Sequence, residues 1–123
     1  MSKTAMDLVQ AAKSEIKEIS IEQANDMLAH GAIALDVREL LEFETGHIPQ
    51  AHHISRGMLE FAIGNHPEFQ DKNAPIVIYC KSGGRSALAT ATLQQLGFSN
   101  VYSMLGGFDE WSAGSDIPPE TQA

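Results

Sequence analysis

The sequence contains a single cysteine, Cys80, among its 123 residues. An internal disulfide is therefore excluded, because no second thiol is present to form one. A lone thiol is either part of the packed interior or a chemically active group. The residues that surround it in the sequence must decide between these two interpretations.

Basic residues are also scarce. Lys and Arg together number 8 against 16 Asp and Glu, and the formal net charge is −8 at pH 7. Nucleic acids and anionic membranes bind to positive surfaces, so this charge argues against both as partners. A small anionic substrate is not excluded, because a local cluster of N–H groups with one or two cations can make the electrostatic potential of one site positive on a chain of negative net charge.

Long apolar runs are absent from the sequence. No stretch approaches the roughly 18–20 residues that a membrane-spanning helix needs. The first residues also lack the basic start and apolar core of a signal peptide. We therefore expect a cytoplasmic protein. A hydrophobic content of 43% and a charged content of 20% are typical of one packed globular domain.

Segments with the period of strands alternate with segments that have the period of helices. We expect strands at 17–20, 32–37, 51–54, 74–79 and 100–103, and helices at 6–16, 22–29, 39–44, 57–63, 86–96 and 107–111. This alternation predicts an α/β fold, a three-layer sandwich in which about five mostly parallel strands are flanked by helices on both faces. We expect a helical extension over residues 1–16, one domain over 17–114 and a loose tail over 115–123.

The clearest buried strand, residues 74–79, runs directly into Cys80. In open α/β sheets, ligands bind beyond the carboxyl ends of the strands. A turn with two glycines follows, and their freedom of φ allows backbone N–H groups to converge on one centre. The helix expected behind the turn adds partial positive charge at its N-terminus. The residues that we expect to bind substrate are Lys81, Ser82, Gly83, Gly84, Arg85 and Ser86.

All of these features stabilise a thiolate relative to a thiol, and the thiolate is the nucleophilic form of cysteine. We therefore predict that Cys80 is the catalytic nucleophile. The same loop suits an oxyanion such as a sulfonate, or a cysteine persulfide. The alternative is a buried structural cysteine before a glycine turn. It is disfavoured because two cations, two glycines and a capping serine follow within six residues.

Several segments resemble the successive signatures of the rhodanese family, in matching order from about residue 18 to 113. They are Leu35-Asp36-Val37-Arg38-Glu39, Phe43, Gly46-His47-Ile48-Pro49, Cys80-Lys81-Ser82-Gly83-Gly84-Arg85-Ser86 and Leu105-Gly106-Gly107-Phe108-Asp109-Glu110-Trp111. The resemblance implies a five-stranded parallel sheet and a sulfurtransferase. In its cycle, the cysteine takes a sulfane sulfur from a small anionic donor such as thiosulfate and passes it to a thiol or to cyanide. It implies no metal or organic cofactor, and a sulfur-accepting protein is a further candidate partner.

Two alternatives stay open. Protein tyrosine phosphatases and arsenate reductases place a His before the cysteine and five residues between Cys and Arg. Here Tyr79 precedes Cys80 and four residues separate it from Arg85, so the ring of N–H donors should fit one sulfur atom better than a phosphoryl group. The second alternative is a non-catalytic rhodanese-like module that binds a protein or senses oxidants. Such modules commonly lack the cysteine that this chain retains.

Three further polar residues are candidates for a supporting role. Asp36 and Arg38 end the second expected strand and could reach the mouth of the site. An internal clamp between loops is the favoured alternative for this pair. Arg56 precedes a segment that could cross the pocket, where it would hold an anionic donor, or it is an ordinary surface arginine.

Histidines invite a metal hypothesis at His47, His52, His53 and His66. Their spacing forms no helical i, i+4 pair, and adjacent strand residues point to opposite faces, so we predict no metal site. We interpret His47 as a hydrogen-bonding residue that ties a loop. Gln50 stands where the rhodanese family usually has Gly. If the turn there requires a positive φ, Gln50 costs about 1 kcal/mol.

Overall fold

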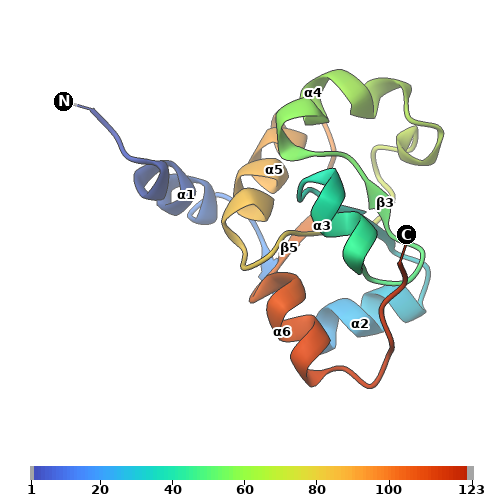
Figure 1. The fold of residues 1–123 in the computed structure, drawn as a ribbon. Coiled ribbons are helices and arrows are strands. Elements are labelled where there is room, and N and C mark those ends of the chain that lie inside the picture. The colour runs from blue at the N-terminus through green and yellow to red at the C-terminus, as the bar shows by residue number, and fades with distance from the viewer. Residues whose placement is uncertain (1, 122–123) are drawn as a thin grey trace.

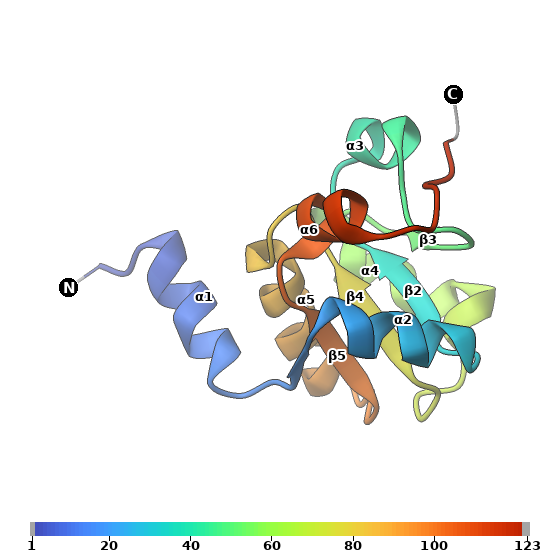
Figure 2. The same cartoon turned by 90° about the horizontal axis from the view of Figure 1, so that it is seen from below.

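The computed structural model describes residues 2–121. Five strands form one sheet in the order β1-β5-β4-β2-β3, and every neighbouring pair is parallel (Figures 1 and 2). The strands are β1 (Glu18–Ile19), β2 (Ile33–Asp36), β3 (His52–His53), β4 (Ile76–Tyr79) and β5 (Val101–Met104). The parallel α/β sheet predicted from the alternating periodicity is confirmed.

Helices cover both faces of this sheet. They are α1 (Ala5–Lys13), α2 (Ile21–Ala29), α3 (Leu40–Thr45), α4 (Leu59–Ala62), α5 (Gly84–Gln95) and α6 (Gly107–Gly114), with single 3-10 turns η1 (Arg56–Met58), η2 (Ile63–Asn65) and η3 (Pro67–Phe69). One apolar core lies between the sheet and the side of α4 and α5, and the other lies between the sheet and α2 and α6 (Figure 2). Within residues 2–121, none of the helices has both the length and the apolar character to cross a membrane.

The central strand β4 is fully buried, since all four of its residues have 0% exposure. Its side chains alternate between the two cores, with Ile76 and Ile78 in one and Val77 and Tyr79 in the other. Such a run buried on both faces is what a parallel sheet requires of its central strand. The strand therefore delivers the next residue, Cys80, to the carboxyl edge of the sheet.

Three helical segments differ from the expectation drawn from the sequence pattern. Helix α1 ends at Lys13 rather than at 16, and the hydroxyl of Ser14 bonds to the carbonyl of Ala11 just beyond it. Helix α5 begins at Gly84, two residues before the expected Ser86. The expected helix over 57–63 is a series of single turns from η1 to η2. Glycine has a low helix propensity, so the sequence pattern does not indicate that α5 begins at Gly84. The turn before Gly84 determines that start.

Helix α1 lies beside α5, outside the two layers that cover the sheet (Figure 1). Val9 and Ala12 of α1 are buried against Ala87 of α5 and form a small third core. A capping box at Thr4 begins the helix, in which the Thr4 hydroxyl accepts from the N–H of Asp7 and the Asp7 carboxylate accepts from that of Thr4. The N-terminal extension is thus packed onto the domain.

The segment after Gly114, expected as a loose tail, returns to the body of the molecule. Glu120 pairs with His47 through two backbone hydrogen bonds of 2.8 and 2.9 Å. Nothing in the local sequence indicates this pairing, because its partner loop lies far away along the chain. Residues 122–123 of the expected tail lie outside the described residues.

The loop that Glu120 joins contains a strained residue. Gln50 has φ 67°, and it alone among the described non-glycine residues has a positive φ. We predict that Gln50→Gly raises the free energy of unfolding by about 0.5–1 kcal/mol, because relief of the left-handed strain exceeds the entropy that glycine adds to the unfolded chain. Urea unfolding measures the difference. The control Gln50→Ala keeps the strain and should give no gain; equal stability of the two variants would contradict the prediction.

Candidate active site at Cys80

Cys80 lies at the carboxyl end of β4 with an exposed fraction of 1%. Its Sγ accepts a hydrogen bond of 3.1 Å from the N–H of Gly83. Gly83 has φ 120°, a backbone conformation open to glycine, although a Cβ there would meet no atom within 4 Å. The glycine is therefore required by the backbone turn that aims the N–H at sulfur, and not by a lack of space.

The N-terminus of α5 follows directly after this turn. By helix geometry, the N–H groups of Gly84, Arg85 and Ser86 have no acceptor within the helix. The positive end of the helix dipole therefore lies beside the sulfur, where it favours a negative charge. The sequence predicted that N–H groups of a loop would converge beside the sulfur. Because the helix starts at Gly84, most of these N–H groups belong to the first turn of α5.

Two buried hydroxyls lie next to the sulfur. The Oγ of Ser86 is 3.6 Å from the Sγ of Cys80 and 2.9 Å from the Oγ of Ser103. Ser103 comes from β5 and was not a sequence candidate, because the contact joins the first turn of α5 to a different element of the fold. A polar residue near the carboxyl end of a predicted parallel strand is the signal that could have indicated it. Both hydroxyls can donate toward a charged sulfur, directly or in series.

The start of α6 holds the backbone of the cysteine loop. The N–H of Phe108 donates to the carbonyl of Cys80 at 2.7 Å, and the N–H of Asp109 donates to that of Lys81 at 3.1 Å. Gly107 makes this close approach possible, because a Cβ at its position would lie 2.5 Å from the carbonyl oxygen of Lys81. Gly107 also has φ 60°.

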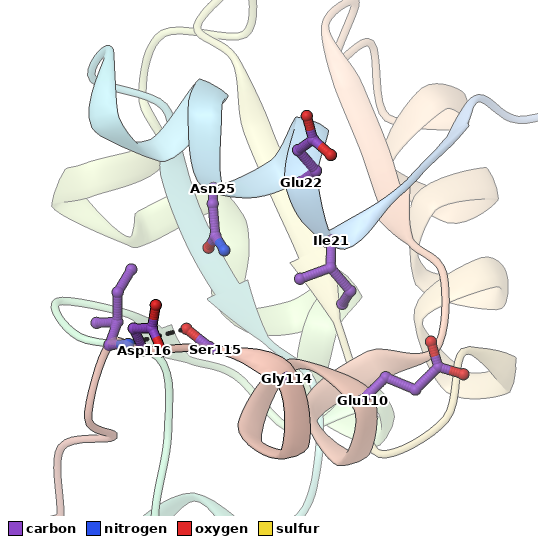
Figure 3. A pocket seen from close by; sticks show the side chains of 8 residues that line it. Ile21, Glu22, Asn25, Glu110, Gly114, Ser115 and Asp116 are labelled. Carbon is purple, nitrogen blue, oxygen red and sulfur yellow. Dashed lines mark hydrogen bonds between the residues drawn. The ribbon is translucent and has the colours of Figure 1, made fainter.

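The remainder of α6 is anchored on α2. Trp111 is fully buried, and its indole N–H donates to the Oδ1 of Asn25 at 2.9 Å. Figure 3 shows Asn25 directed from α2 toward the end of α6, across a pocket of about 510 Å³. The lining residues of that pocket are Ile21, Glu22, Asn25, Glu110, Gly114, Ser115, Asp116 and Ile117. The pocket therefore shares no residue with the Cys80 loop.

Each of the four cationic candidates near the site contacts a carboxylate. The pairs are Arg38–Asp36 at 2.7 Å, Arg56–Glu60 at 3.1 Å, Lys81–Asp109 at 3.1 Å and Arg85–Glu42 at 2.7 Å. The side chains of Lys81 and Arg85 are thus held by acids, which offset the positive charge that we expected these residues to supply near the thiol. The local positive potential comes mainly from N–H groups and the helix dipole.

The pair at the end of β2 forms the clamp that was the favoured alternative. Arg38 is 5% exposed, and its guanidinium bonds to both carboxylate oxygens of Asp36. It also donates to the carbonyl of Gly46 at 2.6 Å and lies 4.4 Å from the ring centre of Phe108. Arg38 therefore ties the loop before β3 to α6 rather than presenting a free charge.

Arg56 connects η1 to α5. Its two terminal nitrogens bond to the carboxylate of Glu60 at 3.1 Å and to the hydroxyl of Thr92 at 3.0 Å. Its side chain is 24% exposed. The segment that begins at Arg56 is therefore fastened to α5 through an arginine that is already paired.

Arg85 and Glu42 join the cysteine loop to α3. Two hydrogen bonds of 2.7 and 3.1 Å join the two ends of the guanidinium to the two carboxylate oxygens. These bonds, helped by the backbone N–H of Glu39, lower the pKa of Glu42 from 4.5 to about 2, although partial burial opposes the shift. Glu42 is therefore ionised throughout the ordinary pH range. Sequence reasoning missed it, because no periodicity links α3 to the loop.

The histidines have structural partners. His47 bonds through Nδ1 to the carbonyl of Phe43 at 2.9 Å and stacks on its ring, as expected for a residue that ties a loop. His53 contacts the carbonyl of Arg38 at 2.7 Å, whereas His52 lies against other aromatic rings. Among residues 2–121, no three His, Cys, Asp or Glu side chains are grouped as metal ligands would be.

The glycine at the loop contact gives a direct stability test. We predict that Gly107→Ala lowers the free energy of unfolding by about 2 kcal/mol or more, because Cβ would meet the Lys81 carbonyl and the positive φ would be strained. Gly114→Ala, at the other end of α6, meets no atom within 4 Å and should change stability by less than about 0.5 kcal/mol. Chemical denaturation compares them, and equal effects would contradict this contact.

The Glu42–Arg85 pair predicts a pH dependence. A carboxyl whose pKa falls from 4.5 to about 2 stabilises the fold above pH 4.5, and this contribution is lost as the pH falls toward 2. Glu42→Gln should therefore lower the melting temperature most near pH 6, by an amount equivalent to about 1 kcal/mol or less. The difference from wild type should vanish near pH 2. Thermal unfolding across this range measures it, and a constant difference would contradict the ion pair.

The chain is similar to known proteins over most of its length. A family model for the rhodanese-like domain matches residues 20–114. The thiosulfate sulfurtransferase GlpE of Ectopseudomonas mendocina is 38% identical over 108 residues, which are 88% of this chain and 94% of the relative. GlpE of Pseudomonas entomophila is 41% identical over 108 residues, with the same 88% and 94% coverage.

Solved structures show the same relationship. A Rhodopseudomonas palustris protein of unknown function, described as a possible tyrosine phosphatase, has a TM-score of 0.85 and 33% identity, covering 95% of this chain and 96% of its own. The human single-domain sulfurtransferase has a TM-score of 0.74 and 28% identity, covering 80% of this chain and 97% of its own. Together with the family model over residues 20–114, these matches show that the chain belongs to the rhodanese-like domain family.

Proposed function

We propose that this protein is a sulfurtransferase in which Cys80 carries the transferred sulfur as a persulfide. The observation that carries the proposal is the hydrogen bond from the N–H of Gly83 to Sγ, at the N-terminus of a twelve-residue helix. The backbone N–H and the positive end of the helix dipole favour a negative charge on a sulfur in this position. The relatives named thiosulfate sulfurtransferase support the same reaction.

The reaction proceeds by two displacements. In the first, the Cys80 thiolate attacks the outer sulfur of thiosulfate, a sulfur–sulfur bond forms, and the electron pair of the broken bond leaves with sulfite. In the second, a thiolate or cyanide attacks the outer sulfur of the persulfide, and the Cys80 thiolate is regenerated. No electron is gained or lost overall, so neither step requires a redox cofactor.

The loop stabilises negative charge at both stages. The N–H groups of Gly83 and of the first turn of α5 favour the persulfide anion, just as they favour the thiolate. The hydroxyl of Ser86, supported by Ser103, adds a donor that can rotate between the Gly83 carbonyl and the sulfur. Lys81 and Arg85 shape the rim, but each shares its charge with an acid.

A phosphatase is the second candidate, because the similar R. palustris protein is described as a possible tyrosine phosphatase. A phosphoryl group needs a free arginine to hold its oxygens and an acid to protonate the leaving group. Here Arg85 is bound at both ends by Glu42, and Asp36 is bound by Arg38. We therefore expect no hydrolysis of p-nitrophenyl phosphate.

A cytoplasmic location stays a prediction from the composition of the chain. A non-catalytic module that binds a partner stays an alternative, disfavoured because Cys80 is present and its loop is complete. Turnover with thiosulfate and cyanide separates a catalyst from such a module.

Intact-mass spectrometry tests the proposed nucleophile. Incubation with thiosulfate alone should increase the mass of the wild-type protein by one sulfur atom, about 32 Da, and cyanide should then remove it. Cys80→Ser should show no increase, because serine forms no persulfide. Equal sulfur uptake by the two proteins would refute Cys80 as the carrier. Thermal unfolding of Cys80→Ser confirms that the variant is folded.

A further inference from the structure

The rim of the cysteine loop carries two cations and two acids. Lys81 contacts Asp109, and Arg85 contacts Glu42. A donor that approaches Cys80 therefore meets N–H groups and hydroxyls, while both rim cations are already engaged. A second negative charge on the donor therefore adds little binding free energy at this rim. An arginine that bonds the donor must first give up its bond to a carboxylate.

The two rim pairs differ in strength. Lys81 and Asp109 make a single contact, and their side chains are 60% and 52% exposed, so water and salt weaken it. Arg85 and Glu42 make two parallel hydrogen bonds, and their side chains are 35% and 32% exposed. The Arg85 pair is therefore the one that must be displaced if a donor is to reach a guanidinium.

Glu42 is also held from its own side. Its Oε1 accepts a 3.0 Å hydrogen bond from the N–H of Glu39, at the first turn of α3. This capping interaction orients the carboxylate before it meets Arg85. The Glu42 carboxylate is thus preorganised beside the cysteine loop. A donor can bind the Arg85 guanidinium only if it first displaces this carboxylate, which costs free energy.

We infer that Glu42 is a specificity-determining residue that selects sulfur donors by charge, disfavouring dianions such as thiosulfate relative to monoanionic thiosulfonates. It does so by occupying both ends of the Arg85 guanidinium. The inference rests on the proposed function and deepens it, because it assigns a preferred donor class to the same site. That class consists of sulfane donors that bear a single negative charge.

Thiosulfate and methanethiosulfonate isolate the effect of charge. With either donor, the Cys80 thiolate attacks the outer sulfur and the bond from that sulfur to the sulfonyl sulfur breaks. The electron pair leaves with sulfite, a dianion, in the first case and with methanesulfinate, a monoanion, in the second. The Cys80 persulfide that forms is the same, so the donors differ mainly in the charge of the leaving group.

The test compares these two donors in the Glu42→Gln variant. The amide oxygen can still accept from Glu39, but the negative charge opposite Arg85 is removed. We expect the ratio of kcat/KM for thiosulfate to kcat/KM for methanethiosulfonate to rise about fivefold, mainly through a lower KM for thiosulfate. The ratio is taken within one variant, so a loss of folded protein cancels from it.

Glu44→Gln is the matched control. It removes the same charge from the same helix, and within residues 2–121 the ion pair of Arg85 is with Glu42 and not with Glu44. Its ratio should stay within about twofold of wild type. An unchanged ratio in Glu42→Gln, or an equal rise in Glu44→Gln, would overturn the inference.

Persulfide formation separates this inference from the proposed function. If wild-type Cys80 gains sulfur from both donors while the ratio stays flat in Glu42→Gln, the donor selection by Glu42 is wrong and the sulfurtransferase proposal stands. If wild type gains sulfur from neither donor, the proposed function itself fails.

Discussion

Two backbone hydrogen bonds from the first turn of α6 to the carbonyls of Cys80 and Lys81 hold the cysteine loop in place. With those carbonyls bonded away from the sulfur, the loop can direct the N–H of Gly83 toward it. The contact needs a residue without Cβ at Gly107, because the two backbones approach too closely for any other. Trp111 anchors α6 on α2, so the cysteine loop that α6 holds is supported by the core of the domain.

The side-chain charges around Cys80 are balanced between cations and acids. The arginines and the lysine near the loop are matched by carboxylates, and stabilisation of the sulfur falls to backbone N–H groups, hydroxyls and the α5 dipole. Such donors are fixed by the fold and do not reorganise during the reaction. A site of this kind stabilises one negative charge well, and it does not depend on the net charge of −8 carried by the chain.

Much of the fold follows from local pattern. The apolar run before Cys80 predicts a strand buried on both faces, and the structure makes it the centre of the sheet. The positive φ suspected at Gln50 is observed. Errors fall where distant segments decide the outcome. The tail pairs with His47, a residue remote in sequence, and local propensity does not indicate this contact. Helix α5 starts early at Gly84, because the turn at Gly83 sets its first residue despite the low helix propensity of glycine.

The sequence by itself determined the glycine turn after Cys80 and the order of strands and helices, because residue type and periodicity act over a few neighbouring positions, and it predicted Cys80 as the nucleophile. Only the tertiary structure decided which acids pair with the cations of the cysteine loop. Glu42, Ser103 and Asp109 reach the loop from three other elements, and pairing across such separations leaves no trace in a single sequence. The tertiary contacts therefore turn a loop with two apparent cations into one whose cations are already bound, since opposite charges brought together by folding satisfy one another first.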